Sequence, residues 1–150
     1  GDNVKVFSPM QLQELDIQNI LREFLSSAKE DDFVGINAYL PRNADTTRLL
    51  TGLRFTLGKI TGCATTMGFG PRYLHSTGQL HKGGRNNGVF IQITADVDKV
   101  LEIPTLNMTF GNFEVAQAIG DYEALVSRGR RVIRMHFSSL NGLRSLVESL

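Results

Sequence analysis

"FVGINAYL" (residues 33–40) is a largely apolar run that stops at Pro41. A short apolar run bounded by a proline is typical of a β-strand buried on both faces of a sheet. Three later stretches predict three more strands: the short "CATTMG" (63–68), then "VFIQITA" (89–95) and "RVIRMHF" (131–137). Strands of this kind need helices above and below them.

Helical periodicity fills the segments between and after these strands. Three helices are expected there, over residues 45–60, 112–128 and 139–150. Asp45 can cap the first of them and Gly62 follows its end, while Gly120-Asp121 is expected to break the second. Because strands alternate with helices, we expect a single α/β domain over residues 1–150. Its fold class is a three-layer α/β/α sandwich around a mainly parallel sheet of about four to five strands.

A further helix is predicted ahead of the first strand, over residues 8–29. Ser8 is a good N-cap, a proline follows it at the first helical position, and Gln11 completes a capping box. Residues 1–32 would then form an N-terminal helical lead-in. The acidic run Glu30-Asp31-Asp32 is predicted to be a solvated turn, because three neighbouring carboxylates resist burial.

Composition excludes several classes of protein. The chain has 150 residues, 41% of them hydrophobic and 21% charged, which is globular and not disordered. A net charge of +1 argues against bulk nucleic-acid binding. No apolar run approaches the roughly 18 residues of a membrane span, so no membrane role is expected. Cys63 is the single cysteine, which favours a reducing cytoplasm. The chain starts at Gly1 without methionine, which fits either a processed native start or a domain of a longer protein.

The polar chemistry of the chain is concentrated in "GPRYLHSTGQLHKGG" (residues 70–84). This stretch lies in a loop of about twenty residues, Gly68 to Gly88, that leaves the carboxyl end of the second predicted strand. Ligands of such sheets gather outside the carboxyl ends of the strands, and long loops in compact domains are commonly functional. The location therefore favours a binding or catalytic site.

Two interpretations of the loop histidines remain open from the residues alone. His75 can move protons near neutral pH, as histidines do, or it can have a structural hydrogen-bonded role. His81 lies six residues later, so the two share no helical face. No spacing in the sequence resembles a zinc site, and no metal is expected.

The basic residues of the loop also allow two interpretations. Arg72, Lys82 and Arg85 could hold a phosphate with help from backbone N–H groups of the neighbouring glycines, or they could be a solvated basic surface. The remaining candidates have simpler structural explanations. Glu114, Asp121 and Glu123 are explained by helix caps or exposed helix faces. His136 is explained by a place at a strand end, and Cys63 by a core position.

The stretch "LHSTGQ" (residues 74–79) resembles the "LHSxGQ" motif of glucose-6-phosphate isomerases of the Gram-positive bacterial kind. The longer runs "GFGPRYLHSTGQLHKGGRNNGVFIQIT" and "AQAIGDYEALVSRGRRVIRMHF" resemble the C-terminal region of fused transaldolase/glucose-6-phosphate isomerase proteins. The resemblance covers roughly residues 33–137, about two thirds of the chain.

The resemblance implies the interconversion of glucose 6-phosphate and fructose 6-phosphate without metal or organic cofactor. The motif histidine opens the sugar ring in that family, and it matches His75. A glutamate then carries a proton between C1 and C2 through a cis-enediol, and no acidic residue here lies in a matching stretch. The residues expected to contact substrate or orient His75 are Arg72, Ser76, Gln79, His81 and Lys82.

The resemblance also implies partners. The chain would work with an N-terminal sugar-isomerase domain, and with a transaldolase domain where one is attached, in a homodimer that shares its active sites. A non-catalytic alternative stays open: a cap or regulatory module whose basic, glycine-rich loop binds a sugar phosphate or another small anion.

Overall fold

The computed structural model describes residues 3–96, 102–104 and 109–150. Within that part of the chain, five strands form one sheet in the order β1-β5-β4-β2-β3. The strands are β1 (Val4–Phe7), β2 (Phe33–Tyr39), β3 (Ala64–Phe69), β4 (Gly88–Ala95) and β5 (Arg131–Phe137). The pairs β2–β3, β2–β4 and β4–β5 are parallel, and only the β1–β5 pair is antiparallel.

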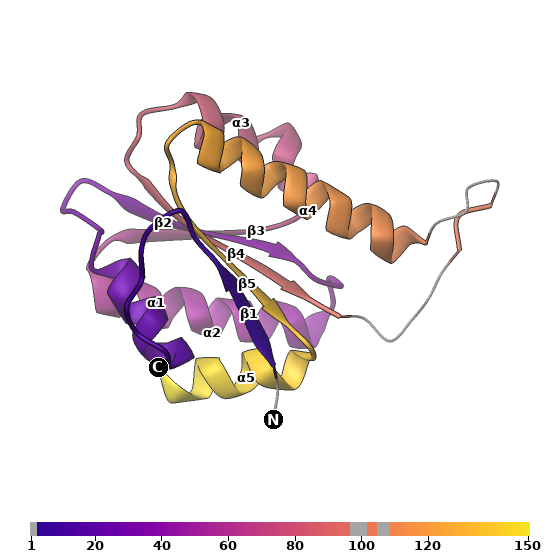
Figure 1. Cartoon of the computed structure of the whole chain (residues 1–150), viewed down its shortest axis with the longest axis horizontal. Coiled ribbons are helices and arrows are strands. Elements are labelled where there is room, and N and C mark those ends of the chain that lie inside the picture. The colour runs from indigo at the N-terminus through magenta and orange to yellow at the C-terminus, as the bar shows by residue number, and fades with distance from the viewer. Residues whose placement is uncertain (1–2, 97–101, 105–108) are drawn as a thin grey trace.

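Helices cover both faces of the sheet, as Figure 1 shows. One face carries α1 (Ile17–Leu25), α2 (Ala44–Thr61) and α5 (Leu140–Ser149), and the other carries α3 (Thr77–Gly83) and α4 (Phe110–Ser127). The three-layer α/β/α sandwich with a mainly parallel sheet is therefore confirmed.

The main core lies between the sheet and the layer of α1, α2 and α5. The fully buried side chains there come from both layers, and they include Leu21, Phe24, Ile36, Leu53, Ile91, Ile133 and Leu143. The opposite face has two smaller apolar clusters. Phe90 and Val132 pack with Leu125 of α4, and Tyr39 packs with Tyr73 and Ala118. The α4 side of the sheet is thus less apolar than the α1–α2–α5 side.

The predicted helix over residues 8–29 is wrong in extent. The helix begins only at Ile17, where the Asp16 carboxylate accepts hydrogen bonds from the N–H groups of Gln18 and Asn19. Ahead of it, Ser8 Oγ accepts from the Met10 N–H in a local turn and caps no long helix. Residues 4–7 form an edge strand that the sequence did not predict, because its pattern extends over only four residues.

The acidic turn was also predicted incorrectly at one residue. Asp32 is 9% exposed and forms an ion pair with Arg131 of β5, with 2.7 Å between Oδ2 and Nη1. Because Arg131 hydrogen-bonds this carboxylate, it holds the pKa of Asp32 below its usual value. A cation 99 residues away in the chain therefore makes burial of this acid possible.

Two helix boundaries differ from the sequence prediction. Asn43, not Asp45, caps α2, in a reciprocal capping box with Thr46. The expected break at Gly120-Asp121 is absent, because α4 runs through both residues, and Asp121 is buried instead. Gly62 and Gly129 follow their helices with φ of 68° and 63°, as C-terminal glycines do.

Candidate functional site

The stretch at residues 70–84 is more ordered than a plain loop. It leaves the carboxyl end of β3 and forms a 3-10 helix, η1 (Arg72–His75), which Ser76 joins to α3. Tyr73 is the buried residue of η1. It packs over Gly68 so closely that a Cβ there would lie 3.0 Å from the tyrosine Cβ. The tyrosine thus holds η1 against the end of the sheet.

Four of the predicted site residues point outward from this segment. Arg72, His75, Ser76 and Gln79 are all exposed. Ser76 Oγ donates to the Tyr73 carbonyl and Gln79 Nε2 donates to the Leu74 carbonyl, both over 3.4 Å. Within the part of the chain that the structure describes, the His75 side chain has no hydrogen-bond or ion-pair partner. Its imidazole is therefore available to a ligand or a second protein surface.

Lys82 points inward instead, towards a buried carboxylate. Its Nζ lies 2.8 Å from Oδ1 of Asp121 on α4, and the Asp121 side chain is only 2% exposed. Tyr73 Oη donates a hydrogen bond to the other carboxylate oxygen, Oδ2. Burial raises the pKa of Tyr73, so the phenol remains a donor. Asp121 consequently joins η1, α3 and α4.

His81 also lies inside the protein. It is 6% exposed, and its ring centroid is 4.7 Å from that of Phe90 and about 6 Å from those of Phe33 and Tyr73. Burial lowers the pKa of His81, with Lys82 acting in the same direction and Asp121 opposing it. The structure therefore separates His81 and Lys82, which anchor the segment, from the exposed group around His75.

The three basic residues considered for a phosphate site do not act together. Lys82 binds Asp121, and Arg85 lies 3.8 Å from Asp31 in an exposed pair. Among the described residues, only Arg72 of these three has no carboxylate partner.

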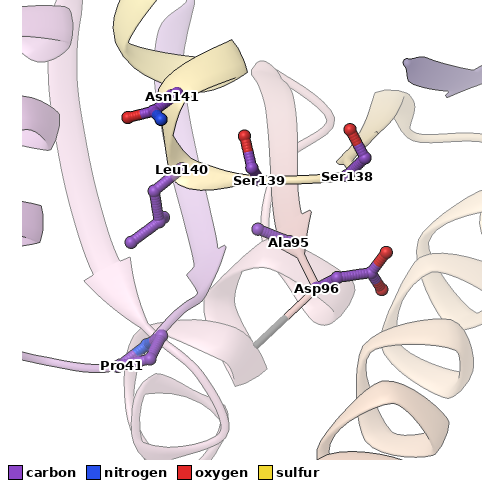
Figure 2. Close-up of a pocket in the computed structure, with 7 residues that line it drawn as sticks. All are labelled: Pro41, Ala95, Asp96, Ser138, Ser139, Leu140 and Asn141. Atoms are coloured by element: carbon purple, nitrogen blue, oxygen red, sulfur yellow. The ribbon is translucent and has the colours of Figure 1, made fainter. Parts of the chain in front are cut away.

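Sequence reasoning missed a second polar location, at the carboxyl edge of the sheet. A cavity of about 270 Å³ lies where β2, β4 and β5 end and α5 begins. Figure 2 shows Ser138, Ser139, Leu140 and Asn141 along the turn into α5, with Asp96 near the end of β4. The helices that follow β2 and β4 in sequence, α2 and α4, lie on opposite faces of the sheet, and ligands of open α/β sheets bind at such a switch point. The missed signal is the pair Ser138-Ser139 directly after a predicted strand.

Asp96 connects this cavity to the α4 side of the sheet. Its Oδ1 lies 3.4 Å from Nε2 of His136, whose Nδ1 lies 2.9 Å from Thr94 Oγ1. His136 thus sits at the strand end, as the sequence predicted, and it orients two polar partners there.

The described residues contain no group of three or more histidine, cysteine, aspartate or glutamate side chains that could hold a metal ion. Cys63 packs in the main core, and its thiol donates to the Lys29 carbonyl. No helix in the described ranges is long and apolar enough to cross a membrane.

Comparison with known proteins shows the fold and no more. No protein-family model matches the chain, and no curated protein matches it. Among solved structures, the chain is similar to a hypothetical protein, TT0462, from Thermus thermophilus, with a TM-score of 0.73 and 17% sequence identity. The match covers 87% of this chain and 37% of that chain. The chain therefore spans little more than a third of its structural relative, and at this identity the likeness shows a shared α/β architecture.

Proposed function

We propose that this chain is the C-terminal domain of a glucose-6-phosphate isomerase of the kind fused to transaldolase. In this proposal the domain contributes His75 to the interconversion of glucose 6-phosphate and fructose 6-phosphate. The "LHSTGQ" resemblance supplies the reaction, and one geometric observation carries the proposal. His75 is exposed and unpaired at the end of η1, while Tyr73 before it and Lys82 after it are both held by the buried carboxylate of Asp121.

This arrangement suits proton transfer to a substrate held between two surfaces. Ring opening requires one group that gives a proton to the ring oxygen and a group that takes one from the anomeric hydroxyl. An imidazole can do both near neutral pH when no protein group already occupies it. Tyr73 and Lys82, both bound to Asp121, restrict the backbone that carries His75. Arg72, Ser76 and Gln79 lie beside it on the exposed side and would contact sugar hydroxyls or the phosphate.

The remaining parts of the reaction belong to other protein surfaces in this proposal. The glutamate that moves the proton between C1 and C2 would come from the sugar-isomerase domain ahead of this chain or from the partner subunit. The isolated 150 residues are therefore expected to fold without isomerase activity.

The test is an isomerase assay on the complete protein that contains this domain, from fructose 6-phosphate to glucose 6-phosphate. We expect His75→Asn to lower kcat by about 10²- to 10⁴-fold, which is the usual contribution of a general acid–base group. We also expect it to remove one limb of the pH–rate profile, while KM changes little.

Thr77→Ala is the matched control, because Thr77 is exposed in the same segment and has no role in the proposal. It should leave kcat and the pH profile unchanged. If His75→Asn keeps full turnover but abolishes a response to sugar phosphate, the domain is the non-catalytic regulatory module instead.

A further inference from the structure

The α4 face of the sheet has an unusual polar area, which we call the polar rows. Strand residues that are paired in register point to the same face of a sheet. The first row is therefore Asn37, Gln92 and Arg134, from β2, β4 and β5. The second row, one step closer to the carboxyl ends, is Tyr39, Thr94 and His136. Six polar side chains thus lie side by side across three central strands.

The positions next to the polar rows are apolar. On the opposite face, the same stretches of strand carry only apolar side chains: Ile36, Ala38, Ile91, Ile93, Ile133 and Met135. The next row towards the amino ends, Gly35, Phe90 and Val132, is also apolar. Parallel strands buried in a three-layer sandwich are normally apolar on both faces, and buried polar groups are costly unless they are hydrogen-bonded. These side chains therefore need hydrogen-bond partners, and the second row has them: Thr94 bonds His136, and Tyr39 Oη is hydrogen-bonded to Tyr73 Oη.

The first row lacks partners for several of its polar atoms. Asn37 is 1% exposed and Gln92 is fully buried. Gln92 Nε2 donates to the Ala118 carbonyl over 2.9 Å, but Gln92 Oε1 and Asn37 Nδ2 have no hydrogen-bond partner. Arg134 Nε is also buried and unpartnered. One acceptor and two donors are thus left unsatisfied on adjacent strands.

Arg134 is a buried cation without a counter-ion in the described part of the chain. It is 9% exposed, and no carboxylate there lies within ion-pair distance of its guanidinium. Its neighbours are the Phe7 ring, 5.1 Å from its central carbon, and Tyr122 of α4. Lys5, on the adjacent strand, is paired in register with His136. An arginine in this state attracts an oxyanion, to which it can present parallel N–H donors.

The amino-terminal half of α4 lies over the rows but buries few of its own side chains. Phe110 and Phe113 are 49% and 46% exposed, whereas Asp121 and Leu125 anchor the carboxyl-terminal half against α3 and the sheet. Glu114 lies in the covering half, and burial raises its pKa. A ligand reaching Asn37 and Gln92 would displace this half of the helix while the anchored half stays in place.

We propose that the polar rows form a binding site for a small polyhydroxylated molecule that carries an oxyanion, either a phosphoryl or a carboxylate group. Arg134 binds the oxyanion. Asn37 donates to one hydroxyl oxygen and Gln92 Oε1 accepts from another, so that all three unsatisfied groups gain partners. The site is separate from the exposed group around His75, and it does not require His75 to be catalytic.

The test is an NMR titration of the isotope-labelled chain with three probes: fructose 6-phosphate, gluconate and neutral fructose. We expect at least one anionic probe to shift, saturably, the Arg134 Nε–H signal, the side-chain amides of Asn37 and Gln92, and the backbone amides of residues 92–95. Neutral fructose at the same concentration should shift none of them. If neither anionic probe gives a saturable shift, or if fructose binds equally well, the proposal is wrong.

Two variants complete the test. Arg134→Gln should weaken binding of the anionic probe by at least about tenfold, as loss of a charged hydrogen bond does. Arg144→Gln, on an exposed position of α5, should bind it unchanged. The titration of the unaltered chain remains decisive if Arg134→Gln fails to fold. Shifts confined to residues 70–84 would overturn the polar-row site and leave the function proposed for His75 intact.

Discussion

Asp121 connects three elements through one buried carboxylate. It accepts a hydrogen bond from Tyr73 of η1 and pairs with Lys82 of α3, while its own backbone belongs to α4. Arg130 adds a further constraint, because its guanidinium donates to the carbonyls of Lys82 and Gly84 over 2.7 Å. The position of His75 therefore depends on contacts made by buried and half-buried residues.

Substitution of Asp121 should be costly. Asp121→Asn leaves Lys82, whose side chain is only 21% exposed, without its counter-ion. We expect the free energy of unfolding to fall by about 2–4 kcal/mol, because removing one partner of a largely buried pair leaves the other charge without a counter-ion. Urea unfolding followed by circular dichroism measures this.

The exposed pair Arg85–Asp31 provides the matched control. Its side chains are 75% and 81% exposed, so Asp31→Asn should change the free energy of unfolding by no more than about 0.5 kcal/mol. Equal effects of the two substitutions would show that the Asp121 pair contributes no more than a surface pair.

At the scale of elements, α4 behaves differently from its sequence signals. Gly120 in the middle suggests a break, yet the helix is continuous from Phe110 to Ser127. Packing of Ala118, Asp121 and Leu125 against the rest of the protein keeps the helix in place across the glycine. Tertiary contacts thus override a local preference that costs about 1 kcal/mol.

Two glycine substitutions test this continuity. Gly120→Ala should raise the free energy of unfolding by about 0.5–1 kcal/mol, because a Cβ there meets nothing within 4 Å and alanine favours a helix. Gly129→Ala should lower it by about 1 kcal/mol, because Gly129 has a φ of 63°, which side chains disfavour. The urea midpoint of unfolding should therefore rise for Gly120→Ala and fall for Gly129→Ala. A destabilising Gly120→Ala would mean that the helix is interrupted there after all.

The first strand, β1, is the element that the sequence pattern did not predict. Val4 and Val6 pack against the main core, while Lys5 and Phe7 lie on the other face. Four alternating residues are too few to distinguish a strand from a loop. What stabilises β1 is its antiparallel pairing with β5, which lies more than a hundred residues later in the chain.

At the scale of the whole molecule, His81 and Asp32 are two buried groups whose shifted pKa values make stability depend on pH. His81 has a folded pKa below its ordinary value of 6.5, because burial disfavours the charged ring. The unfolded chain therefore binds the proton more readily than the folded chain does. As pH falls from 6.5 through the folded pKa of His81, the free energy of unfolding decreases. Asp32, with a pKa lowered from 3.8, loses its contribution only at more acidic pH.

We expect His81→Leu to flatten the pH dependence of unfolding between about pH 7.5 and about pH 5. The substitution removes a ring whose buried Nδ1 has no partner, and it retains an apolar side chain beside Phe33 and Phe90. Urea unfolding at a series of pH values measures the slope. An unchanged slope in the variant would assign the acid loss to another group.

The candidate site was only partly predictable from the sequence, because several of its contacts join residues far apart along the chain. The location of residues 70–84 after a strand follows from a local pattern, and so does the polar character of the segment. The local pattern does not show which side chains of the segment turn inward. Lys82 finds Asp121 on a helix beyond the next strand, and His81 enters an aromatic cluster built from β2, η1 and β4.

The sequence by itself determined the fold class, the strands β2, β4 and β5 to within a residue, and the three-layer arrangement, because apolar periodicity is a property of neighbours along the chain. Only the tertiary structure decided the strand order, the edge pairing of β1, the burial of Asp32 and Asp121, and the alignment of the polar rows. Each of these depends on residues brought together by the crossovers between strands. Such contacts leave no periodic signal in the sequence, since their partners are separated by whole elements.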